Sequence, residues 1–167
     1  MININNKKEL ELIFSQNFGS PYFPILADVY MQEGDLSRAK IVCEIGLQHC
    51  PENNCGKFIL SKIALAQEKP AEAEKWLKQI INQDAGNFKA LRILIRLAVL
   101  LQRSPKAIKL YLNIILAHLP NDKECNDLLN ALENKSASNT INKKISSKNS
   151  AGAYKNPSTS IKNNIDT

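Results

Sequence analysis

The residues best suited to metal or redox chemistry cluster around one short segment. His49 and Cys50 are followed by Cys55, and this His-Cys-x4-Cys spacing resembles half of a zinc site. A structural zinc ion needs four ligands, and the sequence offers no second half. Cys43 and Cys125 lie in apolar surroundings and are expected to be small buried side chains. We therefore expect reduced structural cysteines and no metal or cofactor, with a Cys50–Cys55 disulfide as the alternative under oxidation.

Catalytic chemistry has little support in the sequence. His49 and His118 both fall near the C-terminal ends of predicted helices, where a positive charge is favoured. No serine or cysteine has a general base and an orienting acid close by in sequence, and no glycine-rich phosphate loop is present. The sequence therefore predicts a protein that is not an enzyme.

A stripe of basic residues is more informative. Lys89, Arg92 and Arg96 are spaced i, i+3 and i+7, which places them on one side of a helix. Residues 88–121 hold six basic residues and no acid, so this segment has a net charge of +6. Such a stripe can bind carboxylates, and an arginine–carboxylate fork adds specificity. The alternative interpretation is an ordinary solvated basic face.

A second concentration of positive charge lies near the C-terminus, and acidic residues elsewhere in the chain offset much of the sum. The chain of 167 residues has a net charge of +6, and residues 135–167 contribute six lysines and one acid, or +5. Residues 134–167 are rich in Ser, Thr, Asn and Lys, so they cannot bury enough apolar surface to fold, and we expect a disordered basic tail.

No apolar run of the sequence approaches the roughly 20 residues that span a bilayer. Residues 1–8 are polar and lack a signal-peptide pattern, so the expected location is cytoplasmic.

Self-similarity at a spacing of 34 residues determines the predicted fold. A shift of this length superposes Ala39 on Ala73 and Ala107, and it also superposes the three leucines Leu26, Leu60 and Leu94. Each copy contains two apolar stripes of helical period. The stripes predict helices over residues 7–15, 21–33, 36–49, 55–67, 70–83, 88–102, 105–118 and 122–133.

Residues that start and stop helices agree with these ranges. Gly34 can end a helix in the left-handed conformation, and Asp35 can cap the helix that follows. Pro70 and Pro105 suit the first turn of a helix, where an N–H has no partner, and Ser104 can cap the helix that begins at Pro105.

These copies resemble the tetratricopeptide repeat family, whose pattern is W-x2-L-G-x2-Y, then A-x3-F, then P. The first copy reads Phe23-x2-Leu26-Ala27-x2-Tyr30, then Ala39-x3-Cys43, then Pro51. The second departs from the pattern at Lys57 and Ala64, and the third has Ile95 where a small residue is typical. The resemblance implies an all-α fold, an α-solenoid of helix-turn-helix repeats. Its expected parts are an N-terminal segment with a short capping helix (1–19), repeats at 20–53, 54–87 and 88–121, and a capping helix (122–133).

In this family the first helices of successive repeats line a groove that commonly holds a peptide or a partner helix. The resemblance implies that one face of each first helix points into this groove. The implied groove residues are Met31, Phe58, Lys62, Leu65, Lys89, Arg92 and Arg96, with Asn126 and Asn130 at the far end. Members that grip chaperone C-terminal tails use a Lys and an Asn in the first repeat, and Pro24 and Asp28 replace them here, so that clamp is not expected.

The leading functional hypothesis is a non-enzymatic scaffold that binds an acidic or amphipathic segment of another protein in the groove. Two alternatives remain open at this stage. The basic third repeat and the lysine-rich tail could contact nucleic-acid phosphates, although only one aromatic residue of the tail, Tyr154, is available for stacking. The chain could also self-associate through its groove, a repeat end or its tail.

Overall fold

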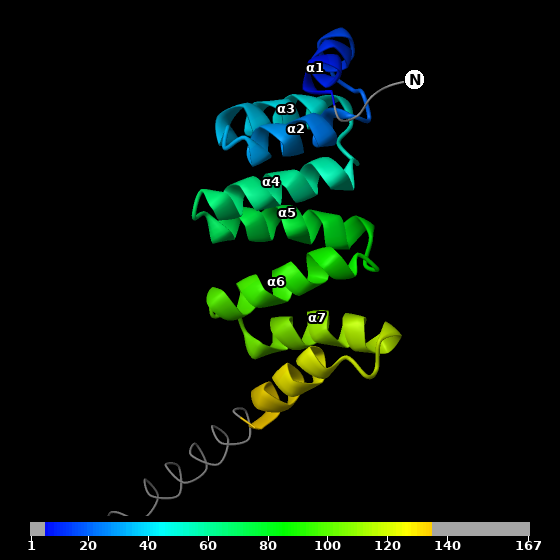
Figure 1. Cartoon of the computed structure of the whole chain (residues 1–167). Helices are drawn as coiled ribbons and strands as arrows, with labels where there is room; N and C mark the ends of the chain where they lie inside the picture. Colours follow the sequence, from blue (N-terminus) through cyan, green and yellow to red (C-terminus); the bar gives the residue numbers. More distant parts are fainter. Residues whose placement is uncertain (1–5, 135–167) are drawn as a thin grey trace, which may run out of the picture. The chain divides into compact units, whose positions relative to one another are not determined.

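The computed structural model describes residues 6–134, and the part it describes contains helices and no strand. Figure 1 shows the helices between residues 23 and 118 as a stack of pairs. The helices are α1 (Lys7–Gln16), α2 (Phe23–Gln32), α3 (Leu36–His49), α4 (Asn54–Ala66), α5 (Pro70–Gln83), α6 (Phe88–Leu100) and α7 (Pro105–His118). A last helix covers residues 123–134. The prediction of an all-α helical-repeat solenoid is confirmed, and each predicted helix boundary lies within two residues of the observed one.

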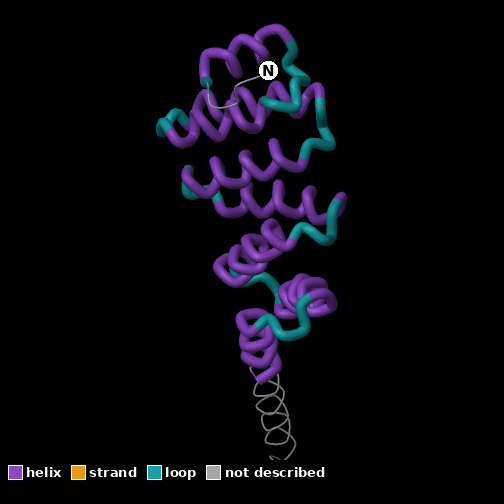
Figure 2. The backbone as a smooth tube through the Cα atoms, turned by 45° about the vertical axis from the view of Figure 1, so that its right-hand side comes forward, coloured by secondary structure: helices purple, strands orange, loops and turns teal. Residues whose placement is uncertain are grey.

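Two compact units make up the chain, Met1–Asn126 and Asp127–Thr167. Within the first unit, α2 packs on α3, α4 on α5 and α6 on α7, and successive pairs meet through α3 with α4 and α5 with α6. Short loops connect the helices (Figure 2). Only residues 127–134 of the second unit are described, and the predicted tail lies outside the described residues apart from Asn134. No helix in the described part of the chain is long and apolar enough to cross a membrane.

One turn conformation recurs at the 34-residue spacing of the sequence. Gly34, Glu68 and Gln102 follow the first helix of each pair, and all three have positive φ, at 83°, 57° and 51°. In each turn, the residue after the one with positive φ donates its N–H to the carbonyl five positions before itself. Asp35 donates to Tyr30 at 2.9 Å, and Lys69 donates to Ala64 at 2.8 Å. This hydrogen bond is typical of a helix end with a left-handed residue. The prediction for Gly34 is confirmed, and the backbone repeats it at two residues that are not glycine.

Short polar side chains begin most of the helices. Asp35 accepts from the N–H of Arg38, and Ser104 accepts from the N–H of Ala107, as expected from the sequence. Other caps were not predicted, and two of them follow the repeat. Asn53 caps α4 and Asn87 caps α6, each accepting from the N–H three residues later. These asparagines also occupy positions 34 residues apart, which fixes where each first helix begins.

The core of the first two pairs is built around an aromatic ring. Phe23 is fully buried, and its ring lies against the backbone of α3 at Gly46 and of α4 at Gly56. A β-carbon at Gly46 would lie 2.4 Å from the ring, and one at Gly56 would lie 2.5 Å from it. The three leucines superposed by the repeat, Leu26, Leu60 and Leu94, are also buried. Small residues thus let neighbouring helices approach closely.

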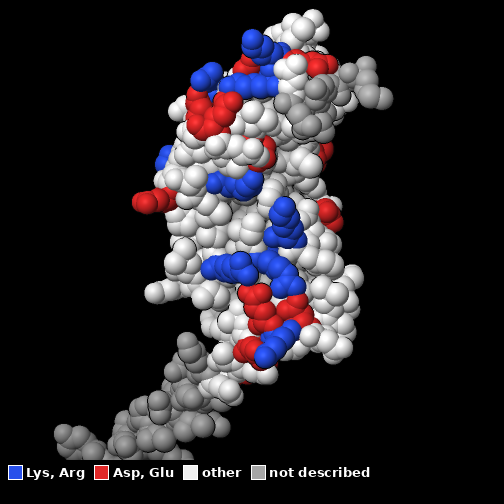
Figure 3. Space-filling view, viewed as in Figure 1, with Lys and Arg blue, Asp and Glu red and all other residues white. Residues whose placement is uncertain are grey.

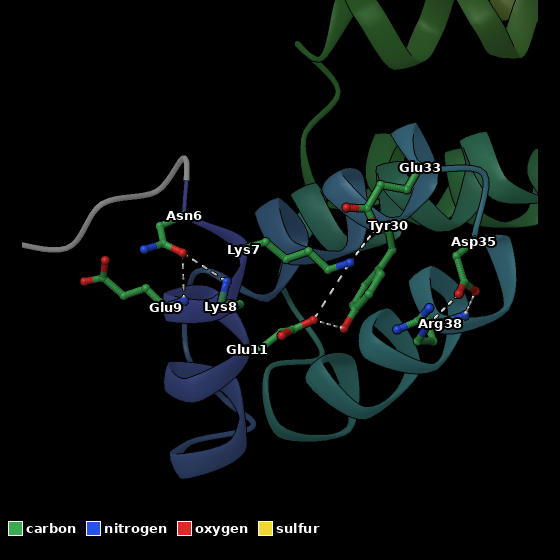
Figure 4. Close-up of polar contacts among 9 residues, drawn as sticks. All are labelled: Asn6, Lys7, Lys8, Glu9, Glu11, Tyr30, Glu33, Asp35 and Arg38. Carbon is green, nitrogen blue, oxygen red and sulfur yellow. Dashed lines mark hydrogen bonds and ion pairs between the residues drawn. The ribbon is translucent and has the colours of Figure 1, made fainter.

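Helix α1 covers the N-terminal end of the stack through polar contacts (Figure 4). The hydroxyl of Tyr30 donates to Glu11 at 2.6 Å, and Lys7 pairs with Glu33 at 2.5 Å. The ammonium of Lys7 and the guanidinium of Arg38 both lie over the Tyr30 ring, at 4.6 and 5.0 Å from its centroid. Burial, with the Glu11 carboxylate, raises the pKa of the Tyr30 phenol above its usual value.

Candidate functional site

A hollow of about 780 Å³ lies between the first helices of the repeats, and we call it the groove. The residues that line it come from α2, from the N-terminal part of α4 and from the start of α6. They are Pro24, Ile25, Asp28, Val29, Gln32, Asn54, Cys55, Phe58, Ile59, Lys62, Asn87 and Lys89. The groove therefore combines aliphatic and aromatic side chains with amides and charged groups.

The structure brings together only part of the predicted set. Phe58, Lys62 and Lys89 line the groove. The other predicted residues of the first unit, Met31, Leu65, Arg92, Arg96 and Asn126, are not among its lining residues. Met31 packs against the buried core instead. The side-chain amide of Asn126 donates to the carbonyls of Pro120 and Asp122 within its own turn, and Asn130 belongs to the second unit.

Each lysine of the groove has a different partner. Lys62 forms an ion pair with Asp28 across α4 and α2, with Nζ 2.8 Å from the carboxylate oxygen. The ammonium of Lys89 lies over the Phe58 ring, 5.1 Å from its centroid. Lys89 forms no ion pair with the residues that the structure describes. Since a cation over an aromatic ring keeps donors free for an anion, Lys89 and Phe58 together make an amphipathic contact surface.

The two arginines of the stripe are neutralised by acids that follow the third helix pair. Arg92 donates to Asp122, and Arg96 donates to Glu124 at 3.1 Å. The hydrogen bond from Arg92, with one from the N–H of Cys125, lowers the pKa of Asp122 to about 2. On the face drawn in Figure 3, basic and acidic side chains adjoin one another. Residues 88–121 themselves contain no acid, and the two acids that pair with the stripe lie just beyond that range, at Asp122 and Glu124.

Asn54 is a groove residue that sequence reasoning missed. It lines the hollow at the first turn of α4, and its Oδ1 is buried without a hydrogen-bond partner in the described structure. A buried acceptor without a donor costs free energy, which sets Asn54 apart from the other residues of the groove. The sequence signal for this residue was the Asn53-Asn54 pair. Asn53 caps the helix, so the side chain of Asn54 is not needed as the cap.

The cysteines do not form a metal site in the described residues. All four are free thiols. Cys50 donates to the carbonyl of Gly19 at 3.3 Å, and Cys55 is exposed in the groove lining. Burial raises the pKa of the Cys43 thiol to about 12 and that of Cys125 to about 11. No group of three or more His, Cys, Asp or Glu side chains within residues 6–134 is placed to hold a metal ion.

Comparison with known proteins relates this architecture to one repeat fold. No protein-family model matches the sequence, and no curated protein matches it either. Among solved structures, the chain is similar to the first tetratricopeptide repeat domain of Spaghetti (RPAP3) bound to the HSP90 peptide SRMEEVD. The match has a TM-score of 0.55 and 18% sequence identity, and it covers 69% of this chain and 93% of that one. The chain therefore has the fold of a tetratricopeptide repeat domain.

Proposed function

We propose that this chain is a non-enzymatic interaction module. Its groove binds an amphipathic peptide or helix of a partner protein, with acidic side chains of the ligand near Lys89. The observation that carries the proposal is the placement of the Lys89 ammonium over the Phe58 ring in one hollow with aliphatic and amide side chains. An apolar surface beside a cation suits an amphipathic acidic ligand, and an asparagine amide suits a peptide backbone.

The structural neighbour supports the class of ligand. That domain is bound to a peptide, SRMEEVD, which contains three acidic residues. The groove of this chain differs from a C-terminal clamp, because Pro24 and the acidic Asp28 line the end formed by α2. We therefore propose recognition of acidic side chains within a ligand rather than of its terminal carboxylate.

The arginine stripe extends the proposed surface. An acidic ligand that reaches Arg92 or Arg96 has to replace Asp122 or Glu124. Because the protein already provides these carboxylates, the net gain from exchange is small and the ligand must fit the geometry. Internal acids thus act against nonspecific binding of polyanions. The free thiols are compatible with a reducing compartment, and we propose that the module acts in the cytoplasm.

A peptide selection tests this function. A random peptide library is displayed and selected against the full chain, and binding of enriched peptides is measured by fluorescence anisotropy. We expect peptides with acidic residues next to apolar ones. Lys89→Glu should weaken their binding about tenfold or more, since it replaces attraction with repulsion in the groove.

Lys106→Glu is the matched control, because Lys106 is exposed on α7 and does not line the groove. It makes the same change in net charge and should leave peptide affinity within about twofold. Far-ultraviolet circular dichroism checks that both variants keep their helices. Peptides that bind the Lys89→Glu variant as tightly as the original chain would show that the groove assignment is wrong.

A further inference from the structure

A second hollow, of about 530 Å³, shares no lining residue with the groove. It is formed by the second helices of the first two repeats, α3 and α5, together with the N-terminal half of α4. Its lining residues are Glu44, Leu47, Gln48, Pro51, Lys57, Leu60, Trp76 and Gln79. The peptide-binding function proposed above does not use any of these side chains.

Lys57 is the unusual residue of this hollow. It is only 5% exposed, although lysine is rarely buried without an acidic partner. Its ammonium donates to the neutral Oε1 of Gln83 at 2.8 Å, and it forms no ion pair with any residue the structure describes. Lys57 also stands where the repeat pattern has an aromatic side chain. An ammonium held by a neutral amide leaves part of its charge uncompensated.

The acids nearby are engaged elsewhere. Glu44 lines the hollow, but its carboxylate lies 3.7 Å from Lys40, which also pairs with Glu72 at 3.6 Å. Glu52 accepts a hydrogen bond from the side-chain amide of Gln83. The Gln83 amide is therefore interposed between Glu52 and Lys57, and a carboxylate from outside could replace its oxygen at the ammonium.

The rest of the hollow suits an apolar group. Trp76 is partly buried against the core, and Leu47, Leu60 and Pro51 lie around the same space. The volume falls within the roughly 300–1,000 Å³ typical of small-molecule sites, which are mainly apolar with a few placed polar groups. Its size and lining thus match an apolar body, and its one buried cation matches an acid.

We propose that this hollow is a binding site for a small-molecule carboxylate with an apolar body. The ligand carboxylate takes hydrogen bonds from Lys57, and the apolar part packs on Trp76 between α3 and α5. Because the hollow bridges two successive repeats, an occupant contacts both helix pairs and favours their packed arrangement.

Fluorescence of Trp76 reports directly on this site, since it is the one tryptophan of the chain. The full-length chain is titrated with phenylpropionate and, in parallel, with the uncharged phenylpropionamide. We expect saturable binding of the acid and at least about tenfold weaker binding of the amide, because the amide cannot form the charge-assisted hydrogen bond to Lys57.

Two variants locate the interaction at Lys57. Lys57→Met keeps the length of the side chain and should remove the preference for the acid over the amide. Gln83→Glu places a carboxylate beside Lys57. This carboxylate competes with the ligand for the ammonium and should weaken binding of the acid about tenfold. Lys75→Met is the matched control, since Lys75 is exposed on α5 next to Trp76 and does not line the hollow.

Three results would overturn the assignment. The first is equal affinity for acid and amide, and the second is unchanged acid binding in Lys57→Met. The third is a Trp76 signal that does not saturate at millimolar acid. Binding of a peptide with a C-terminal phenylalanine would then show that the site takes a chain terminus rather than a free acid.

Discussion

Arg92 donates a hydrogen bond to Asp122, a residue 30 positions later in the chain. Asp122 also accepts from the N–H of Cys125, so it caps the helix of residues 123–134 while it neutralises α6. One carboxylate thus joins the third repeat to the start of the last helix. The most basic segment of the sequence is therefore less basic at its surface than its composition indicates.

The first prediction concerns this carboxylate. The folded pKa of Asp122 is about 2, below the ordinary value of 3.8, so the pair stabilises the fold above the ordinary pKa and loses its effect as pH falls between about 5 and 2. Arg92→Met should raise the pKa of Asp122 toward its ordinary value. Carboxyl carbon NMR titration measures the change.

Arg96→Met is the control for this titration, since Arg96 pairs with Glu124. It should leave the pKa of Asp122 unchanged. The Arg92→Met variant should also lose more stability near neutral pH than near pH 2, where Asp122 is about half protonated in the original chain and almost fully protonated in the variant. A stability difference that is the same at both pH values would contradict the linkage.

The recurring left-handed turn leads to a second prediction. Glu68 has a φ of 57°, a conformation that costs an L-residue about 1–2 kcal/mol and costs glycine little. Glycine also has more entropy in the unfolded chain, which opposes folding and offsets part of this relief. Glu68→Gly should therefore stabilise the fold by about 0.5–1 kcal/mol net. Chemical denaturation measures the change. Glu68→Ala separates loss of the side chain from relief of the backbone, and a gain of equal size in Glu68→Ala would refute the explanation.

Close packing around Phe23 gives a third prediction. Gly46→Ala would place a β-carbon 2.4 Å from the Phe23 ring. Although alanine favours a helix over glycine by about 1 kcal/mol, the clash should dominate and destabilise the fold by about 2–3 kcal/mol. Gly86→Ala, at an exposed turn whose nearest contact is 3.4 Å away, should change stability by less than about 0.5 kcal/mol. Equal unfolding midpoints for the two variants would contradict this packing.

The thiols should differ sharply in reactivity. Cys55 is exposed, whereas burial raises the pKa of Cys43 to about 12 and that of Cys125 to about 11. Because the thiolate is the reactive form, a disulfide reagent near neutral pH should modify Cys55 rapidly and the two buried cysteines only after unfolding. Absorbance of the released thiolate follows the reaction. Cys55→Ser should remove the fast phase, and a fast phase that persists in this variant would assign it to another cysteine.

Much of the fold could be predicted from local patterns in the sequence. Helix limits depend on side-chain periodicity and on caps that act within one turn, so Asp35, Ser104 and the prolines place them correctly. The 34-residue register follows from the same local signals repeated three times. Groove residues were predicted less well. Phe58, Lys62 and Lys89 line the hollow, but Arg92 and Arg96 do not, because the lining on α6 ends in its first turn.

Only the tertiary structure decided which charges remain unpaired. The partners of Arg92 and Lys62 lie outside the helices of these two residues, 30 and 34 residues away in the chain. Such contacts depend on the angle and distance between packed helices, which side-chain spacing along one helix does not specify. The partnerless acceptor of Asn54 and the burial of the Lys57 side chain depend on the same packing. Sequence by itself determined the helices and their repeat, because those signals are local. Packing of the helices determined where binding chemistry is available, because hydrogen bonds and ion pairs form between residues that are distant in the chain.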